Sequence, residues 1–208
     1  MRSGRLGVAL IILMVPTHAS AQVGAGSDWT WSAGISASGF LSDSDWSMTH
    51  PYHGPGSTTW ETLRGEFSHG IRLQGDLEGR RNRLGFRGTV GLLPQTFTQE
   101  SPAREEDFTL MTGGISGVVY PLGGYDRRWE PFAALGVGGQ KATGGLDNTG
   151  FYLSLTGGIR AMITEQVSVE GGAEYYRLKY TQVDLGNNIQ HDLKATTPSV
   201  FLGTRIHW

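Results

Sequence analysis

The sequence predicts an all-β fold, an eight-stranded antiparallel up-and-down transmembrane β-barrel. Three observations lead to this prediction. The chain begins with the features of a secretory signal peptide, it ends on an alternating strand, and seven further segments between them share the same two-residue period. A strand with that period presents one apolar face and one mixed face. Strands of this kind can separate lipid from a polar interior.

The amino-terminal segment has the three parts of a secretory signal peptide. A short basic stretch precedes an apolar run over residues 6–15, and Ala19 and Ala21 stand at the −3 and −1 positions of a cleavage site. We therefore expect a signal peptide over residues 1–21 and a barrel domain over residues 22–208. An uncleaved membrane anchor is the alternative, but a spanning helix needs about 20 apolar residues and this run is shorter.

Composition narrows the class of protein. Glycine accounts for 32 of the 208 residues, about twice its usual share of roughly 7%. Cysteine is absent, which excludes disulfides and thiolate metal sites. The net charge of −2 carries no signature of nucleic-acid binding. The mean hydropathy of −0.24 is low for a helical membrane protein, but in a barrel only alternate residues face lipid.

The first three predicted strands set an apolar row against a polar one. Residues 29–41 alternate tryptophan, alanine and isoleucine with serine and threonine. Residues 60–73 alternate leucine, phenylalanine and isoleucine with arginine, glutamate and serine, and residues 83–93 follow the same rule. A lipid-facing row and an interior row are what the wall of a membrane barrel requires.

The next four predicted strands are richer in glycine. Residues 108–122 are so rich in glycine that either face could point outward. Residues 129–141, 151–163 and 167–181 each set leucine, isoleucine, valine or tyrosine against serine, threonine, glutamine, arginine or glutamate. Glycine in a strand permits the strong local bending that a narrow barrel needs.

The eighth predicted strand, residues 193–208, closes the chain and carries a family resemblance. The last eight residues resemble the β-signal of outer-membrane proteins, a glycine followed by two hydrophobic or aromatic residues, the second of them terminal. Gly203, Ile206 and Trp208 stand at those positions, whereas Phe201 replaces the polar residue usual two positions before the glycine. The resemblance implies recognition by the barrel-assembly machinery.

The predicted connections alternate between long and short. The long ones are residues 42–59, 96–107, 142–150 and 182–192, and the short ones are residues 74–82, 123–128 and 164–166. Long loops on one rim and short periplasmic turns on the other are typical of outer-membrane barrels. Aromatic residues at the strand ends, such as Trp29, Trp129 and Trp208, fit interfacial girdles. Core packing in a soluble β-protein is the alternative.

Charged residues on the mixed faces predict the content of the interior. The candidate inward residues are Arg64, Glu66, Arg72, Arg87, Arg160, Glu170, Glu174 and Arg205. An eight-stranded barrel is only wide enough to be filled by side chains, and buried charges must pair. A plug of ion pairs is favoured, and an ion pathway is the alternative.

The mature chain resembles, over nearly its full length, the small eight-stranded outer-membrane β-barrel proteins of the OmpA and OmpX type. Besides the last strand, residues 130–139 are similar to a PF-x-x-x-G-x-G stretch common in that family. The resemblance implies a monomer in the outer membrane of a Gram-negative bacterium, in contact with its lipid and lipopolysaccharide. A structural or surface-interaction role follows. A narrow pore is the alternative, and a soluble periplasmic barrel for an apolar ligand is a third possibility.

Enzyme activity is a further alternative, because some barrels of this size modify lipid A. The segment 42–59 offers His50, His53 and Ser57, but spacing in a loop does not establish a base–nucleophile pair. We expect no enzyme activity and therefore no catalytic residues, metal site or cofactor.

Overall fold

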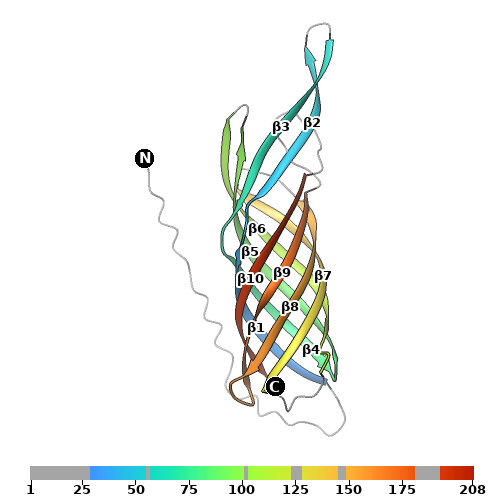
Figure 1. Ribbon diagram of the computed structural model, residues 1–208, viewed down its shortest axis with the longest axis vertical. Helices are drawn as coiled ribbons and strands as arrows, with labels where there is room; N and C mark the ends of the chain where they lie inside the picture. Colours follow the sequence, from blue (N-terminus) through green and yellow to red (C-terminus); the bar gives the residue numbers. More distant parts are fainter. Residues whose placement is uncertain (1–28, 55–56, 101–102, 123–127, 145–148, 181–192) are drawn as a thin grey trace, which may run out of the picture.

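The chain is described here from a computed structural model that covers residues 29–54, 57–100, 103–122, 128–144, 149–180 and 193–208, with backbone only at residues 46–62, 144, 180 and 193–195. The described residues form ten strands (Figure 1): β1 (Trp29–Phe40), β2 (Ser44–Gly54), β3 (Ser57–His69), β4 (Arg72–Arg81), β5 (Leu84–Gln99), β6 (Arg104–Val119), β7 (Trp129–Gly144), β8 (Thr149–Met162), β9 (Val167–Tyr180) and β10 (Leu193–His207). No helix long and apolar enough to cross a membrane occurs in these ranges.

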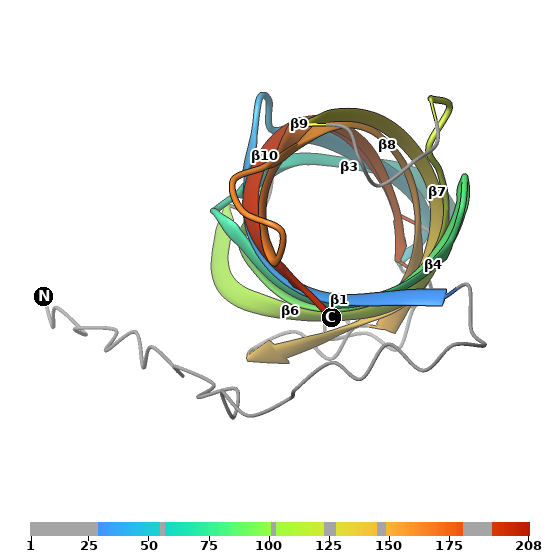
Figure 2. The ribbon, with the colours of Figure 1, turned by 90° about the horizontal axis from the view of Figure 1, so that it is seen from below.

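Eight of these strands form a closed ring. Antiparallel pairing runs β1–β4–β5–β6–β7–β8–β9–β10, and β10 pairs back to β1 with Ala33 opposite Ile206. Figure 2 looks down the axis of the barrel and shows that the ring of strands is closed. The predicted fold, an eight-stranded antiparallel barrel, is therefore confirmed.

The remaining two strands form a hairpin that projects from one end of the barrel (Figure 1). β2 pairs with β3 from Ser44 opposite Phe67 to Gly54 opposite Ser57. The prediction of a loop over residues 42–59 was wrong, because its prolines and glycines do not prevent pairing. β2 stands at the edge of the sheet, where a proline such as Pro51 removes no ladder hydrogen bond from an inner strand.

The second barrel strand lies later in the chain than predicted. The predicted strand 60–73 ends where β4 begins, and the predicted link 74–82 is most of β4 itself. The real turn after β4 is tight and includes Asn82, whose φ of 54° is left-handed, a conformation that asparagine tolerates better than most residues. The shift matters because β4 brings its own charged residues into the barrel.

The outward face of the barrel is apolar. Ile35 and Ile115 are each 70% exposed, which would be costly in water but suits contact with lipid. The structure also decides the facing of β6, where Ile115 points outward and Leu110 inward. Near the end of the barrel that carries the chain's carboxy terminus, Trp31 packs edge-on against Phe86 on the same outer surface. We call the end of the barrel that carries the carboxy terminus the C-terminal end, and the end from which the β2–β3 hairpin projects the hairpin end.

Glycine is required at one place where the backbones of β8 and β9 approach each other closely. Gly158 lies opposite Gly172, and a Cβ on Gly172 would stand 2.6 Å from the Cα of Gly158 and closer still to the carbonyl oxygen of Gly157. Both obstacles are backbone atoms and cannot turn aside. A side chain at position 172 would therefore force the two strands apart.

Replacing Gly172 with alanine should lower the free energy of unfolding by about 1–3 kcal/mol, the usual cost of overpacking. The matched control is Gly157→Ala, because a Cβ on Gly157 meets no atom within 4 Å. Urea unfolding in lipid vesicles, followed by tryptophan fluorescence, measures both variants. Equal stability of the two would contradict the close approach.

Candidate functional site

The interior of the barrel at the C-terminal end is built around two glutamates. Glu170 on β9 accepts hydrogen bonds from Arg160 Nε at 2.7 Å, Arg205 Nε at 2.9 Å and Arg87 Nη2 at 3.2 Å. Glu78 on β4 accepts from Arg87 Nη2 at 2.7 Å and from Arg160 Nη2 at 3.1 Å. Because both carboxylates share Arg87 and Arg160, these groups form one network and not a set of separate pairs.

Asp76 extends this network directly, whereas the pair formed by Arg80 and Glu130 joins it through the ring of Tyr120, over which both Arg80 and Arg160 lie. Asp76 on β4 pairs with Arg205, and Arg205 Nη1 also donates to Ser32 Oγ on β1 at 2.9 Å. Glu130 on β7 accepts a hydrogen bond from Arg80 Nη2 at 2.6 Å and a second from Nη1. Such two-pronged contacts suit the planar guanidinium group. Side chains from opposite walls therefore meet across the barrel.

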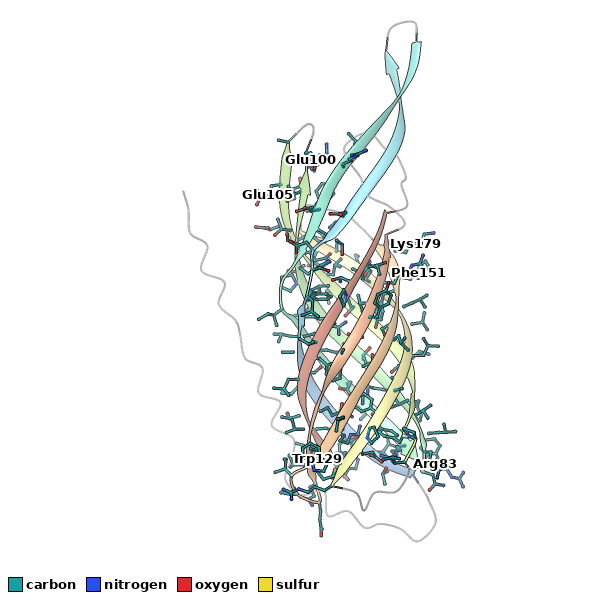
Figure 3. All side chains as sticks on the ribbon, viewed as in Figure 1. Arg83, Glu100, Glu105, Trp129, Phe151 and Lys179 are labelled. Carbon is teal, nitrogen blue, oxygen red and sulfur yellow. The ribbon has the colours of Figure 1, made fainter. Side chains whose placement is uncertain are left out.

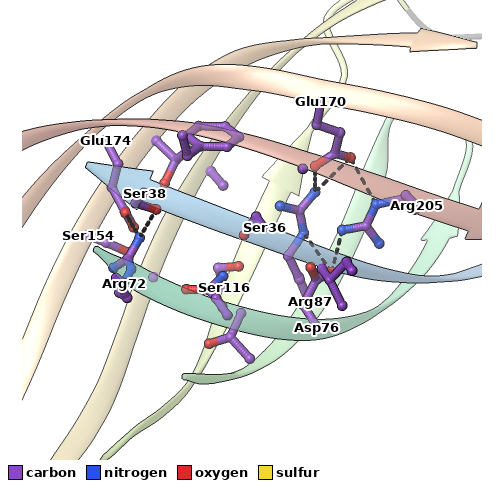
Figure 4. Close-up of a pocket in the computed structure, with 18 of the residues that line it drawn as sticks. Ser36, Ser38, Arg72, Asp76, Arg87, Ser116, Ser154, Glu170, Glu174 and Arg205 are labelled. Atoms are coloured by element: carbon purple, nitrogen blue, oxygen red, sulfur yellow. Dashed lines mark hydrogen bonds and ion pairs between the residues drawn. The ribbon is translucent and has the colours of Figure 1, made fainter. Parts of the chain in front are cut away.

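A separate ion pair lies nearer the hairpin end. Arg72 on β4 pairs with Glu174 on β9 and donates to Ser38 Oγ on β1 at 3.1 Å. Its guanidinium carbon lies 4.8 Å from the centre of the Tyr176 ring. Figure 4 shows this pair on one side of a cavity and the groups around Glu170 on the other.

The buried charges of the described interior are balanced. The cations are Arg72, Arg80, Arg87, Arg160 and Arg205, and the anions are Asp76, Glu78, Glu130, Glu170 and Glu174. All are almost fully buried; the side chains of Glu78 and Arg205 are each 1% exposed. Because each cation has a carboxylate partner within ion-pair distance, the network holds its charges without a surplus of either sign.

Between the ion pairs lies a small polar cavity of about 50 Å³. Ser36, Ser116 and Ser154 contribute hydroxyl groups to its wall (Figure 4). Thr89 adds a further hydroxyl group and Gln74 an amide. A cavity of this size and polarity can hold water. Its volume is too small for a continuous channel.

The interior at the hairpin end is mainly apolar, although the amide side chains of Gln95, Gln99 and Gln140 are also buried there. One buried cluster, which we call the apolar plug, consists of Leu63, Phe67, Leu93, Phe97, Phe108, Leu110, Ala142, Tyr152, Tyr176 and Leu178. At its centre the rings of Phe67 and Phe97 lie 5.5 Å apart, and Phe108 meets Phe67 edge-on at 6.4 Å. Since Phe67 comes from β3, the base of the projecting hairpin supplies part of the plug. The lumen is thus filled by apolar side chains at one end and by ion pairs at the other.

Six of the eight charged residues expected inside the barrel lie in these ion pairs. They are Arg72, Arg87, Arg160, Glu170, Glu174 and Arg205. The other two, Arg64 and Glu66, have exposed side chains. Their assignment to the interior is corrected, because β3 belongs to the hairpin outside the ring, and there the buried row is the one containing Leu63 and Phe67.

Four charged residues of the interior were not predicted from the sequence to belong to the network. They are Asp76, Glu78, Arg80 and Glu130. The first three lie in the segment expected to be a turn. A signal was present, because polar residues alternate there with glycine and leucine in the same rhythm as in the other strands. Glu130 was placed on a polar face but not assigned to the interior network.

The residues of the expected assembly signal lie on the last strand. Gly203 is closely covered by β1, since a Cβ there would stand 2.7 Å from the carbonyl oxygen of Ile35. Ile206 and Trp208 point outward, and Trp208 exchanges backbone hydrogen bonds of 2.9 and 3.1 Å with Trp31. Recognition of this strand by the assembly machinery stays a prediction.

The histidines and serine considered for an enzyme lie outside the described side chains. His50, His53 and Ser57 fall where only the backbone is described. Among the side chains that are described, no group of three or more histidine, aspartate or glutamate residues is arranged to hold a metal ion. The absence of enzyme activity stays a prediction.

Comparison with known proteins supports the architecture. No protein-family model matches the sequence, and no curated protein matches it. Among solved structures, the outer membrane protein OprG from Pseudomonas aeruginosa is similar with a TM-score of 0.55 and 11% identity over 86% of this chain and 95% of that one. The outer membrane protein AlkL (TM-score 0.48, 13% identity, 86% and 90% covered) and Neisserial surface protein A (0.46, 16%, 86% and 97%) also match.

The fold is therefore that of the small eight-stranded β-barrels of the bacterial outer membrane. At 11% identity this likeness concerns architecture alone. It supports the general class that the sequence resembles and does not single out the OmpA and OmpX type.

Proposed function

We propose that this chain is an integral protein of the bacterial outer membrane with a structural or surface-interaction role. It is exported through a signal peptide over residues 1–21, which lie outside the described residues, and is inserted as a monomer by the barrel-assembly machinery. The closed barrel stabilises the envelope, and the projecting β2–β3 hairpin presents a surface to the exterior. The observation that carries this proposal is an apolar outer wall around an interior filled at both ends.

The orientation of the barrel follows from its two rims. In outer-membrane barrels the short turns are periplasmic and the long connections are extracellular. Here the turns after β4 and β8 are short and lie at the C-terminal end, whereas the β2–β3 hairpin extends from the other end (Figure 1). The hairpin end is therefore extracellular in this proposal, and Trp208 lies near the periplasmic surface.

The filled interior favours a scaffold over a pore. An ion crossing the barrel would have to pass the apolar plug and then a network in which each cation already contacts a carboxylate. Moving an ion through an apolar layer is costly, and breaking buried pairs leaves uncompensated charge. A narrow pore remains the alternative function, supported only by the small polar cavity between the two layers.

Planar-bilayer recording should show no conductance steps from the refolded mature chain in concentrated salt. Before recording, faster gel migration of unboiled than of boiled protein establishes that the barrel is folded, and a wide porin in the same membrane establishes that channels are detectable. The double variant Phe67→Ala/Phe97→Ala thins the plug but retains the ion pairs, and we expect it to be silent as well. Regular steps from folded wild-type protein would favour the pore.

A further inference from the structure

The outer surface of the barrel changes character at the hairpin end of β7, β8 and β9. Along β9 the outward row passes from Val169 and Ala173 through Tyr175 to Arg177 and Lys179. Apolar residues are thus followed by an aromatic residue and then by two cations. This order matches the passage from hydrocarbon through the interface to the headgroups of a membrane.

Neighbouring strands add to the same patch. In register, Leu153 on β8 lies opposite Arg177, and Phe151 lies opposite Lys179. The Lys179 ammonium group stands 5.8 Å from the centre of the Phe151 ring, and Figure 3 shows these two side chains together near the hairpin end of the wall. On β7, Lys141 is exposed and lies opposite Thr149, one outward position beyond Phe151.

Lys179 therefore lies over the exposed Phe151 ring, and Lys141 and Arg177 stand at diagonal positions on the two neighbouring strands. Phe151 is 42% exposed, and Gly139, its partner in register on β7, places no side chain beside it. Since adjacent strands are about 4.8 Å apart, Lys141 and Lys179 stand on strands roughly 10 Å apart, within the span of a charged headgroup. The ring and Leu153 supply an apolar floor for the start of an acyl chain.

The opposite side of the same rim carries the other sign. On β6, Glu105 and Asp107 are exposed, and Glu100 follows the end of β5. Figure 3 shows Glu100 and Glu105 on the side of the barrel away from Lys179. A phosphorylated lipid is repelled by that side and attracted to the basic patch, so the charge of the rim selects one sector for the lipid.

We propose that Lys141, Arg177 and Lys179 bind the phosphorylated headgroup of an outer-leaflet lipid, namely the phosphates of lipid A, the membrane anchor of lipopolysaccharide. This inference rests on the proposed function, because it takes the hairpin end as extracellular. The cations bind the phosphates, and the acyl chains continue down the apolar wall past Leu153 and Leu155. The barrel thereby holds a defined lipid on one side.

Native mass spectrometry of the full mature chain, refolded in detergent and titrated with bisphosphorylated lipid A, tests this site. The double variant Lys141→Gln/Arg177→Gln should bind about 25-fold more weakly, since each cation near a membrane surface contributes about fivefold in affinity. The matched control is Arg83→Gln/Arg128→Gln, which removes two exposed cations at the C-terminal end and should bind within about twofold of wild type.

Two further probes identify the source of the phosphate. Dephosphorylated lipid A should bind as weakly as the double variant, and free inorganic phosphate should not displace lipid A. Unchanged binding by Lys141→Gln/Arg177→Gln, equal binding of dephosphorylated lipid A, or displacement by free phosphate would each overturn the proposal. Gel migration of unboiled samples separates this failure from that of the proposed function: a barrel that is folded but indifferent to lipid A refutes only the lipid site.

Discussion

Replacing Glu170 with glutamine will lower the free energy of unfolding by about 3–5 kcal/mol, the usual cost of breaking a buried ion pair by removing one partner. Glu170 accepts hydrogen bonds from Arg87, Arg160 and Arg205. A neutral amide leaves these three buried guanidinium groups with less negative charge around them. Urea unfolding in phospholipid vesicles, followed by tryptophan fluorescence, measures the loss.

The control for this prediction is Glu165→Gln in the exposed turn between β8 and β9, which should change stability by no more than about 0.5 kcal/mol. Removing Arg205 together with Glu170 restores the balance of charge, so the double variant should lose less than the sum of the two single variants. If Glu170→Gln were as stable as Glu165→Gln, the network would not hold the interior together.

Replacing Leu135 with arginine will cost about 2–4 kcal/mol, because a cation in the middle of the bilayer loses its hydration. Leu135 is central among the outward positions of β7 and is 67% exposed. It lies opposite Leu155, another outward leucine, so no acidic neighbour in that pair can compensate the charge. The same vesicle-based unfolding experiment measures the change.

The control for this second prediction is an outward position that lies away from the middle of the bilayer. Val167 begins β9 and also faces outward, but it lies at the end of the wall, where an arginine should cost about 0–1 kcal/mol. If arginine at position 135 cost no more stability than arginine at position 167, the outer face of the barrel would not be in contact with lipid. A soluble barrel for an apolar ligand would then be the better interpretation, and the protein should stay dissolved without detergent.

The outward rows were predictable because the outward positions of a barrel strand repeat every second residue. In β8, for example, Leu153, Leu155, Gly157 and Ile159 stand at successive alternate positions, and the structure exposes all four. The same period placed Arg160 and Glu170 inside. Facing within a strand is thus encoded locally, since adjacent side chains point to opposite sides whatever the partner strand is.

The second strand shows why the rest was not predictable. Gly75 and Gly79 lie in the segment 74–82 that was expected to be a short connection, and in this barrel they occupy outward positions of β4. Which charges meet depends on register and closure, and these are properties of the whole sheet. Arg64 and Glu66 follow the alternation of a barrel strand but lie in a hairpin beyond the wall.

The contact between Arg205 and Asp76 has a consequence for how the barrel can come apart. Arg205 belongs to the last strand and Asp76 to β4, so the pair spans β1 and crosses the junction between the two ends of the sheet. Separating β1 from β10 would break this pair from within and expose two charges to hydrocarbon as the backbone hydrogen bonds are lost. The ion pair therefore holds the β1–β10 junction together from inside the barrel. We infer that the strands cannot separate one after another from this junction and that the barrel unfolds in a single cooperative event.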